Sequence, residues 1–267
     1  MTINMSKKSN WYFSGKLFYV YSPPIKGRRN KKGELISKRV QPNAPFRAAE
    51  PWQCSVYYFW WEYLRRHDEY RQTCESAGRG KYADLYADFG NVHEGDFWSW
   101  WTEHAELFAE PPIRHVSVEH SVSTDQNTLT MSIPLENKLS VSMKQIRRLL
   151  EPQVQKAARK KTLSLAKYPV ATKPVLRTLH EHLLVWDAKK QNPTAHDSEL
   201  ADIAGISVNE VVNGETVAEL RAEDLPTRDL ERVIKRRKQL AVQRHLRIAE
   251  QYIEHVALGE FPKREGR

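Results

Sequence analysis

PWQCSVYYFWWEYLRRHDEY, residues 51–70, is the stretch that most directly decides the fold of this 267-residue chain. Its apolar residues recur every three or four positions, which is the period of one face of an α-helix. That face consists of Val56, Phe59, Trp60, Tyr63 and Leu64. Pro51 suits the first turn of a helix, and Gly78 and Gly80 end the helical pattern. The stretch therefore predicts a helix that buries an aromatic face.

A second aromatic segment, GDFWSWWTEHAELF at residues 95–108, has the same helical spacing. Six of the eight tryptophans lie between residues 52 and 101, so the two segments belong to one cluster. Tryptophans can stack on unpaired bases. The helical spacing favours a buried core instead, and the acidic surroundings of this cluster would repel a nucleic acid backbone.

Three further segments have helical periodicity. Helices are expected at residues 142–161, where Pro152 predicts a kink or a break, and at residues 174–191. The third runs from Thr227 toward Leu258, and about 30 residues at roughly 1.5 Å each give a helix about 45 Å long. Such a helix serves either to form a homodimer or to span the molecule.

Strand character is limited to the first 40 residues and to residues 115–135. Residues 11–22 are dense in aromatic and β-branched residues and predict a strand, and residues 115–135 alternate apolar and polar side chains as a β-hairpin does. Residues 25–40 predict either a long hairpin with a basic tip or a disordered basic arm. The predicted fold class is mainly α with small β-hairpins, with a helical C-terminal region that contains the long terminal helix.

The net charge of +9 is unevenly distributed along the chain. Residues 1–47 carry a net +10, residues 48–143 carry −8, and residues 144–267 carry +7. We predict three parts: a basic strand or arm segment at 1–47, an acidic Trp-rich helical domain at 48–162, and a basic helical region at 163–267. Two basic ends around an acidic middle favour a protein that binds nucleic acid at both ends.

Several classes of chemistry have no signature in this sequence. Cys54 and Cys74 belong to no CxxC or Cys/His cluster, so neither zinc nor a disulfide is expected. His180 and His182 are two positions apart, and on a helix they do not converge on a metal. No phosphate loop, dinucleotide fingerprint or nucleophile elbow occurs. We expect a cytoplasmic protein that is not an enzyme, with no cofactor, no metal and no membrane segment.

Residues 197–216, DSELADIAGISVNEVVNGET, suggest two short helices joined at Gly205. Ala201 is small enough for two helices to cross, Gly205 permits a turn with positive φ, and Ser207 and Glu210 form a capping-box pattern for a second helix. This stretch resembles the helix-turn-helix of bacterial transcription regulators, with Ala201 and Gly205 at that unit's fifth and ninth positions. Gly214 departs from the pattern, since the family has an apolar residue there.

The resemblance implies a DNA interface with two kinds of contact. Base-facing residues on the second helix would be Ser207, Asn209, Val212, Asn213 and Thr216. Because these residues include no Lys or Arg, we expect the phosphate contacts to come from two basic segments, one near the N-terminus and one in the long C-terminal helix. They are Arg28, Arg29, Lys31, Lys32, Lys235, Arg236, Arg237, Lys238, Arg244 and Arg247.

Two functions follow as hypotheses. The first is a double-stranded DNA-binding protein, either a bacterial transcriptional regulator or a mobile-element DNA-binding factor. WEYLRRHDEY, LTMSIPLENKLSVSMKQIRRLL and AEQYIEHVALGEFP are faintly similar to parts of uncharacterised regulators of bacterial integrative elements and plasmids, a likeness that implies no established activity but favours this hypothesis. The second is a non-catalytic structural or adaptor subunit of a nucleoprotein assembly, in which the acidic Trp-rich middle binds RNA or a protein partner.

Overall fold

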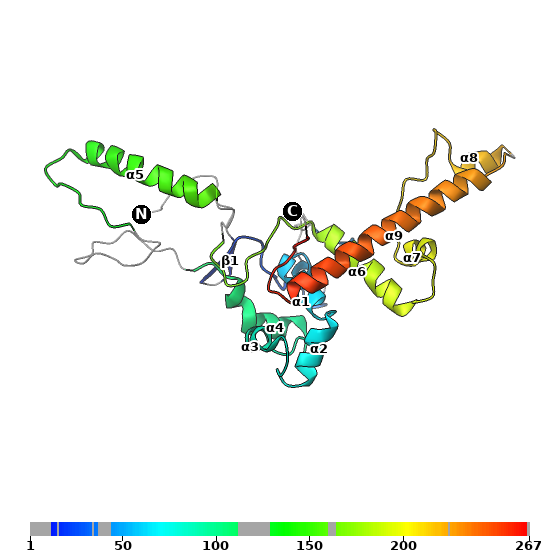
Figure 1. Ribbon diagram of the computed structural model, residues 1–267, viewed down its shortest axis with the longest axis horizontal. Coiled ribbons are helices and arrows are strands. Elements are labelled where there is room, and N and C mark those ends of the chain that lie inside the picture. The colour runs from blue at the N-terminus through cyan, green and yellow to red at the C-terminus, as the bar shows by residue number, and fades with distance from the viewer. Residues whose placement is uncertain are drawn as a thin grey trace. The chain divides into compact units, whose positions relative to one another are not determined.

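The computed structural model describes residues 12–14, 16–33, 35–36, 44–111, 129–159, 164–223 and 225–265, and for Phe13 and residues 153–159 it describes the backbone alone. The fold is mainly helical, as the sequence predicts (Figure 1). The chain forms two compact units, the first from residues 1–109 and 167–267 and the second from residues 110–166. These units differ from the predicted segments 1–47, 48–162 and 163–267, because the Trp-rich part shares one core with the C-terminal helices.

Helix α1 (Val56–Leu64) is the centre of the main core. Seven of its nine residues are buried, so it is apolar on nearly all sides, as a central helix must be. The predicted face is confirmed, since Trp60, Tyr63 and Leu64 are completely buried. The indole of Trp60 packs edge-on against Phe108 and Phe261, at centroid distances of 5.1 and 5.6 Å.

The single helix predicted over residues 51–70 is divided into three elements. A short 3₁₀ turn, η1 (Pro51–Gln53), precedes α1, and α2 (Asp68–Glu75) follows it. His67 causes the second break, because its backbone is extended and its Nδ1 accepts a hydrogen bond from the Tyr70 amide at 3.0 Å. A side chain that caps a new helix in this way makes a change of direction favourable.

The second aromatic segment forms α4 (Phe97–His104) and the 3₁₀ turn η2 (Ala105–Phe108), after α3 (Ala83–Phe89). Asp96 caps α4 by accepting a hydrogen bond from the Ser99 amide at 2.8 Å. Trp100 and Trp101 are only 4% and 6% exposed. The prediction that the tryptophans form a core is confirmed for these residues, and their burial excludes base stacking on their rings.

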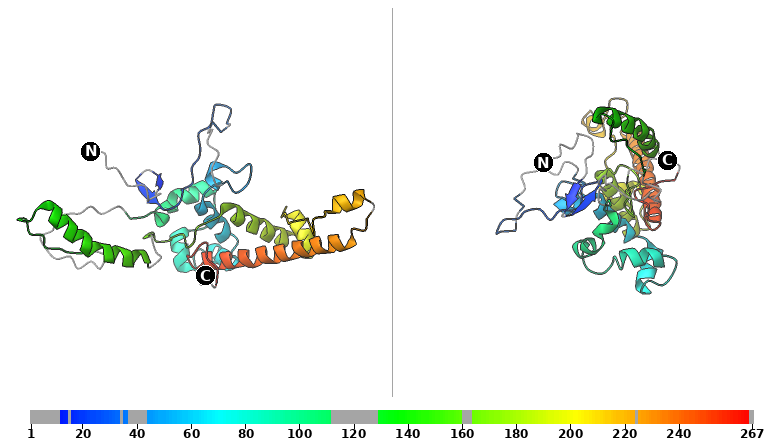
Figure 2. Two further views of the ribbon diagram at one scale, coloured as in Figure 1. Left: turned by 90° about the horizontal axis from the view of Figure 1, so that it is seen from above. Right: turned by 90° about the vertical axis from the view of Figure 1, so that its left-hand side faces the viewer.

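Helices α6 (Leu176–Gln191) and α9 (Arg228–Val256) agree with the predicted C-terminal helices. Helices α6 and α7 (Asp197–Ile203) pack against α9, and Figures 1 and 2 show α8 (Val217–Ala222) beside the N-terminal end of α9. Helix α9 has 29 residues and is therefore about 43 Å long at ~1.5 Å per residue. It contributes to all three apolar clusters of the first unit, so it spans that unit.

The described residues near the N-terminus form two small hairpins. The strand predicted at residues 11–22 is a hairpin of β1 (Tyr12–Ser14) and β2 (Leu17–Tyr19), in which Tyr12 pairs with Tyr19. Tyr19 is 1% exposed and packs against Tyr57 and Trp101, so the hairpin is fixed to the core by its last residue. The second hairpin, around Arg29 and Leu35, belongs to the candidate interface below.

The second unit contains α5 (Leu139–Arg159), which continues through Pro152 without ending. At the junctions of this unit, the Glu110 carboxylate accepts hydrogen bonds from the Ser164 hydroxyl and the Leu165 amide. Of the hairpin predicted at 115–135, residues 115–128 lie outside the described residues, and residues 129–134 are not in a strand. None of the described helices combines the length and the apolar run needed to cross a bilayer.

Replacing the central tryptophan tests this account of the core. Trp60→Ala is expected to lower the free energy of unfolding by about 3–5 kcal/mol, because it removes a fully buried aromatic side chain and leaves a cavity. The control is Trp98→Ala, which removes the same side chain from a half-buried position and should cost less than half as much. Urea unfolding followed by circular dichroism measures both, and equal losses would contradict the assignment.

Candidate nucleic-acid interface

The first of the two short helices predicted over residues 197–216 is present as α7. Helix α7 begins with a capping box in which the His196 amide donates to the Glu199 carboxylate at 3.1 Å. Ala201 is completely buried, and Gly205 has a φ of +65° in the turn that ends the helix. The small residue and the glycine therefore have the roles that their types predict.

The second half is not a helix, so the prediction of a groove-facing helix at Ser207–Thr216 is wrong. Val212 and Glu215 exchange two backbone hydrogen bonds of 3.0 Å around Asn213 and Gly214, which have φ values of +54° and +91°. Asn-Gly is the dipeptide that favours such a tight turn with two positive φ angles. The capping box forms later, between Thr216 and Glu219, where α8 begins.

The five residues predicted to face the bases consequently lie on a loop and at the start of a helix. Ser207, Asn209 and Asn213 are exposed, whereas Val212 and Thr216 are half-buried. The Asn209 side chain accepts a hydrogen bond from the Val211 amide at 2.9 Å, and the Thr216 hydroxyl caps α8. The loop thus presents a few polar side chains but no regular surface that fits a groove.

Arg237 attaches this loop to α9. Its Nη1 donates to the backbone oxygens of Asn209 and Val211 at 2.6 and 2.8 Å. On the same helix, Lys238 forms an ion pair with Asp202 of α7 at 2.5 Å. Two of the cations predicted to contact phosphate are therefore engaged in holding neighbouring segments against α9.

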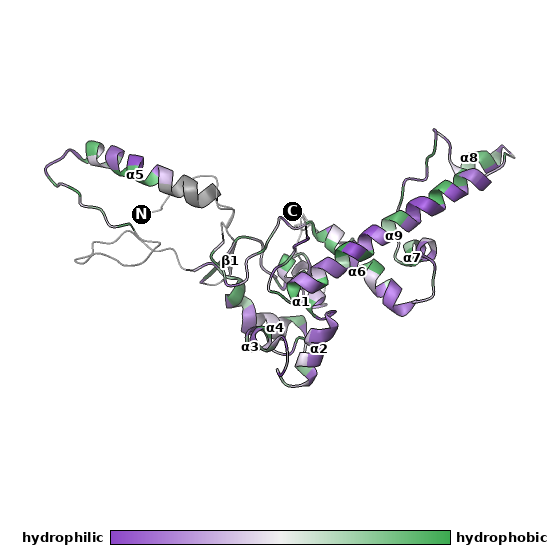
Figure 3. Cartoon of the chain, in the orientation of Figure 1, coloured by the Kyte–Doolittle hydropathy of each residue, from purple (hydrophilic) through white to green (hydrophobic). Residues whose placement is uncertain are grey.

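The other predicted cations of α9 are exposed. Between residues 232 and 249 the helix has seven Lys and Arg and no Asp or Glu. Hydrophilic and hydrophobic residues alternate along the helix (Figure 3). Five of these cations are exposed and form no ion pair with any described residue: Arg232, Lys235, Arg236, Arg244 and Arg247. At about 100° per residue they occupy roughly half of the helix circumference. We call these five residues the basic face.

Arg232 was not predicted as part of the site. It lies four residues before Arg236 and fifteen before Arg247, so all three have similar directions around the helix. That spacing is visible in the sequence and could have identified it. Arg237 and Lys238 lie on the side of α9 against which the loop and α7 pack, whereas Arg232, Arg236 and Arg247 are exposed. Which side of α9 is covered depends on the fold and cannot be read from the spacing.

The N-terminal basic residues lie on the second hairpin. A bridge between Arg29 and Leu35 and a turn closed by the Gly33 amide form it, which agrees with the hairpin interpretation of residues 25–40. The Arg29 guanidinium pairs with Glu50 at 2.5 Å and donates to the Gly33 carbonyl. All four predicted cations are exposed, and Arg28, Lys31 and Lys32 form no ion pair with any described residue.

His182, one of the two histidines considered as metal ligands, is buried and hydrogen-bonded to another histidine. His182 is 2% exposed, and its Nδ1 lies 2.8 Å from Nδ1 of His245 on α9, so the pair shares one proton in a hydrogen bond. Burial lowers the pKa of His182 to about 3, and the nearby charges of His245, Arg264 and Arg244 add to the effect. In the described residues, no three His, Cys, Asp or Glu side chains are arranged to hold a metal ion.

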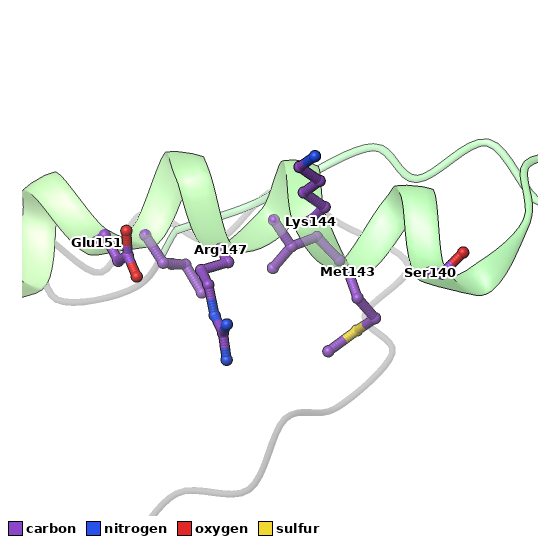
Figure 4. A pocket seen from close by; sticks show the side chains of 7 residues that line it. Ser140, Met143, Lys144, Arg147 and Glu151 are labelled. Atoms are coloured by element: carbon purple, nitrogen blue, oxygen red, sulfur yellow. The ribbon is translucent and has the colours of Figure 1, made fainter.

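A cavity of about 600 Å³ follows α5, and all of its described lining residues belong to that one helix. Figure 4 shows Met143 and Arg147 pointing to the same side of α5. Helix α5 therefore exposes an amphipathic face that carries cations of its own.

Comparison of this chain with protein-family models, with curated proteins and with solved structures found no match.

The role assigned to Arg237 predicts a specific loss of stability. Arg237→Ala should lower the free energy of unfolding by about 1 kcal/mol, because two hydrogen bonds to the loop are removed. Its neighbour on the exposed side provides the control, since Arg236→Ala should change stability by less than about 0.5 kcal/mol. Urea unfolding compares the two variants, and a larger loss in Arg236→Ala would contradict the structural role of Arg237.

The buried histidine pair predicts acid destabilisation. The pKa of His182 is lower in the folded protein than in the unfolded chain, so below about pH 6.5 the unfolded chain binds a proton that the folded protein does not. Stability should be greatest above pH 6.5 and fall toward pH 3, by about 1.4 kcal/mol per pH unit for this group. Replacing His182 with Gln should make the slope of unfolding free energy against pH shallower between pH 6 and 4. An unchanged slope would show that this histidine does not contribute.

Proposed function

We propose that this protein binds double-stranded DNA through the basic face of α9. The observation that supports this proposal is the set of five exposed cations on one helix, in an 18-residue stretch without an acidic side chain. Lys and Arg neutralise DNA phosphates and release condensed counterions, which is the main source of affinity in such complexes. A role as a transcriptional regulator or a mobile-element DNA-binding factor falls within this proposal.

The loss of the predicted second helix changes the expected mechanism. Phosphate contacts from α9 set the affinity, and the accessible cations Arg28, Lys31 and Lys32 provide a second basic surface. Sequence preference depends on the loop that Arg237 holds beside α9, where Asn209 and Asn213 offer amides that can pair with adenine. We therefore expect strong salt dependence and modest sequence preference.

Charge removal from α9 tests the proposal. If five phosphates are neutralised, the slope of log K against log salt is about −4.5, and affinity falls roughly 500-fold between 50 and 200 mM salt. The triple variant Arg232→Gln, Arg236→Gln, Arg247→Gln should reduce the slope by about 3 and weaken binding at least about 100-fold at low salt. Fluorescence anisotropy with a labelled 30-base-pair duplex measures both quantities.

The matched control removes three exposed cations from α5: Lys144→Gln, Arg147→Gln, Arg148→Gln. It changes the net charge equally and should keep the slope and nearly all of the affinity. Equal losses in the two triple variants would show that only total charge matters, and would contradict the assignment to α9. Preferential binding of a structured RNA competitor would favour the nucleoprotein adaptor instead.

A further inference from the structure

A pocket of about 410 Å³ lies where the segment before α6 meets the segment after α9. Backbone pairing far apart in sequence builds it, since the Ala171 amide donates to the Phe261 carbonyl and the Thr172 hydroxyl donates to the Pro262 carbonyl, both at 2.9 Å. These contacts bring Lys173 to the pocket that Lys263 and Arg264 also line. The volume is within the usual range for small-molecule sites.

The pocket is positively charged. Its described lining includes three cations and no Asp or Glu. Lys263 pairs with Glu260 at 2.5 Å, and this contact holds the pKa of Glu260 below its usual range, so the two charges offset each other. Lys173 is exposed and has no ion-pair partner among the described residues. Lys173 and Arg264 therefore leave a local charge of about +2.

Arg264 is held in a fixed orientation. Its Nε donates to the Tyr252 hydroxyl at 2.9 Å, and its guanidinium lies 5.4 Å from the centroid of that ring. Tyr252 is 5% exposed, so the arginine rests on a rigid support. A guanidinium held by Nε retains its terminal N–H groups as a planar fork, which matches two oxygens of a phosphate.

The rest of the lining is largely apolar. Pro174, Val175 and Leu179 line the pocket beside the cations, at the beginning of α6. A ligand that fits has a charged end and a small apolar body. The positive end of the α6 dipole adds to the same potential.

We infer that this pocket binds small phosphate monoesters, with the phosphate between Lys173 and Arg264 and the organic body against Pro174, Val175 and Leu179. A phosphate monoester carries about −1.5 to −2 charges at neutral pH, which balances the local charge. A carboxylate carries one and leaves a positive charge unbalanced. The pocket is thus a small-molecule site, and it requires no cation of the basic face.

Isothermal titration calorimetry with phenyl phosphate tests the inference on the full chain. We expect saturable one-to-one binding at millimolar or lower concentration, weaker binding of benzoate, and none of phenol. Lys173→Glu should weaken phenyl phosphate binding about tenfold or more, because it reverses an exposed charge that no described residue pairs with. Arg79→Glu makes the same change of charge elsewhere in the first unit and should have no effect.

Two further experiments distinguish binding in this pocket from binding to the basic face of α9. The triple variant of Arg232, Arg236 and Arg247 should bind phenyl phosphate normally, and a 12-base-pair duplex should not displace it. The inference is overturned if phenyl phosphate does not bind, if Lys173→Glu binds as tightly as the unchanged protein, or if benzoate binds equally well. Displacement by the duplex would assign the pocket to DNA and would also overturn it.

Discussion

Three apolar clusters in the first unit have one helix in common, and the packing along α9 is the constraint on which the rest of this unit depends. Tyr252 and Val256 enter the aromatic core, Val242 packs between α6 and α7, and Leu230 closes the small cluster around α8. Because a helix has a fixed rise and turn, these contacts must be in register over its whole length. A displacement of α9 would disturb every cluster together.

This constraint also explains where the charges lie. One side of α9 must be apolar along the contacts with α6 and α7, so its cations occupy the remaining circumference. Basic residues at the border between the apolar and exposed sides of α9 bind neighbouring segments of the chain. Arg237 holds the backbone of the 206–216 loop, and Lys238 pairs with α7. The five cations of the basic face lie on the side that these contacts leave exposed, together with the apolar Val233 and Leu240.

Much of this fold could be predicted from the sequence, because periodicity reports which face of a helix is buried. The core residues Trp60, Tyr63 and Leu64 follow from spacing alone, as do the positions of α6 and α9. The 207–216 segment could not be predicted in this way. There two local signals compete, the Ser207 capping-box pattern and the Asn213-Gly214 turn, and the turn forms.

The basic face of α9 and the pocket beside α6 differ in how far the sequence predicts them. Exposed cations on one helix can be predicted from their spacing, although Arg232 was missed and Arg237 has a structural role. The pocket beside α6 has no sequence signature, because Lys173 and Arg264 line the same pocket only through pairing between segments about 90 residues apart. Such long-range approaches depend on the whole fold and leave no local pattern.

The most direct measurement of the central claim is hydrogen–deuterium exchange of the full chain, with and without a saturating DNA duplex. Binding through the basic face predicts that DNA slows exchange in peptides covering residues 228–250 and the adjoining 206–216 loop. Slower exchange confined to residues 139–159, with α9 unchanged, would contradict it and would move the interface to α5.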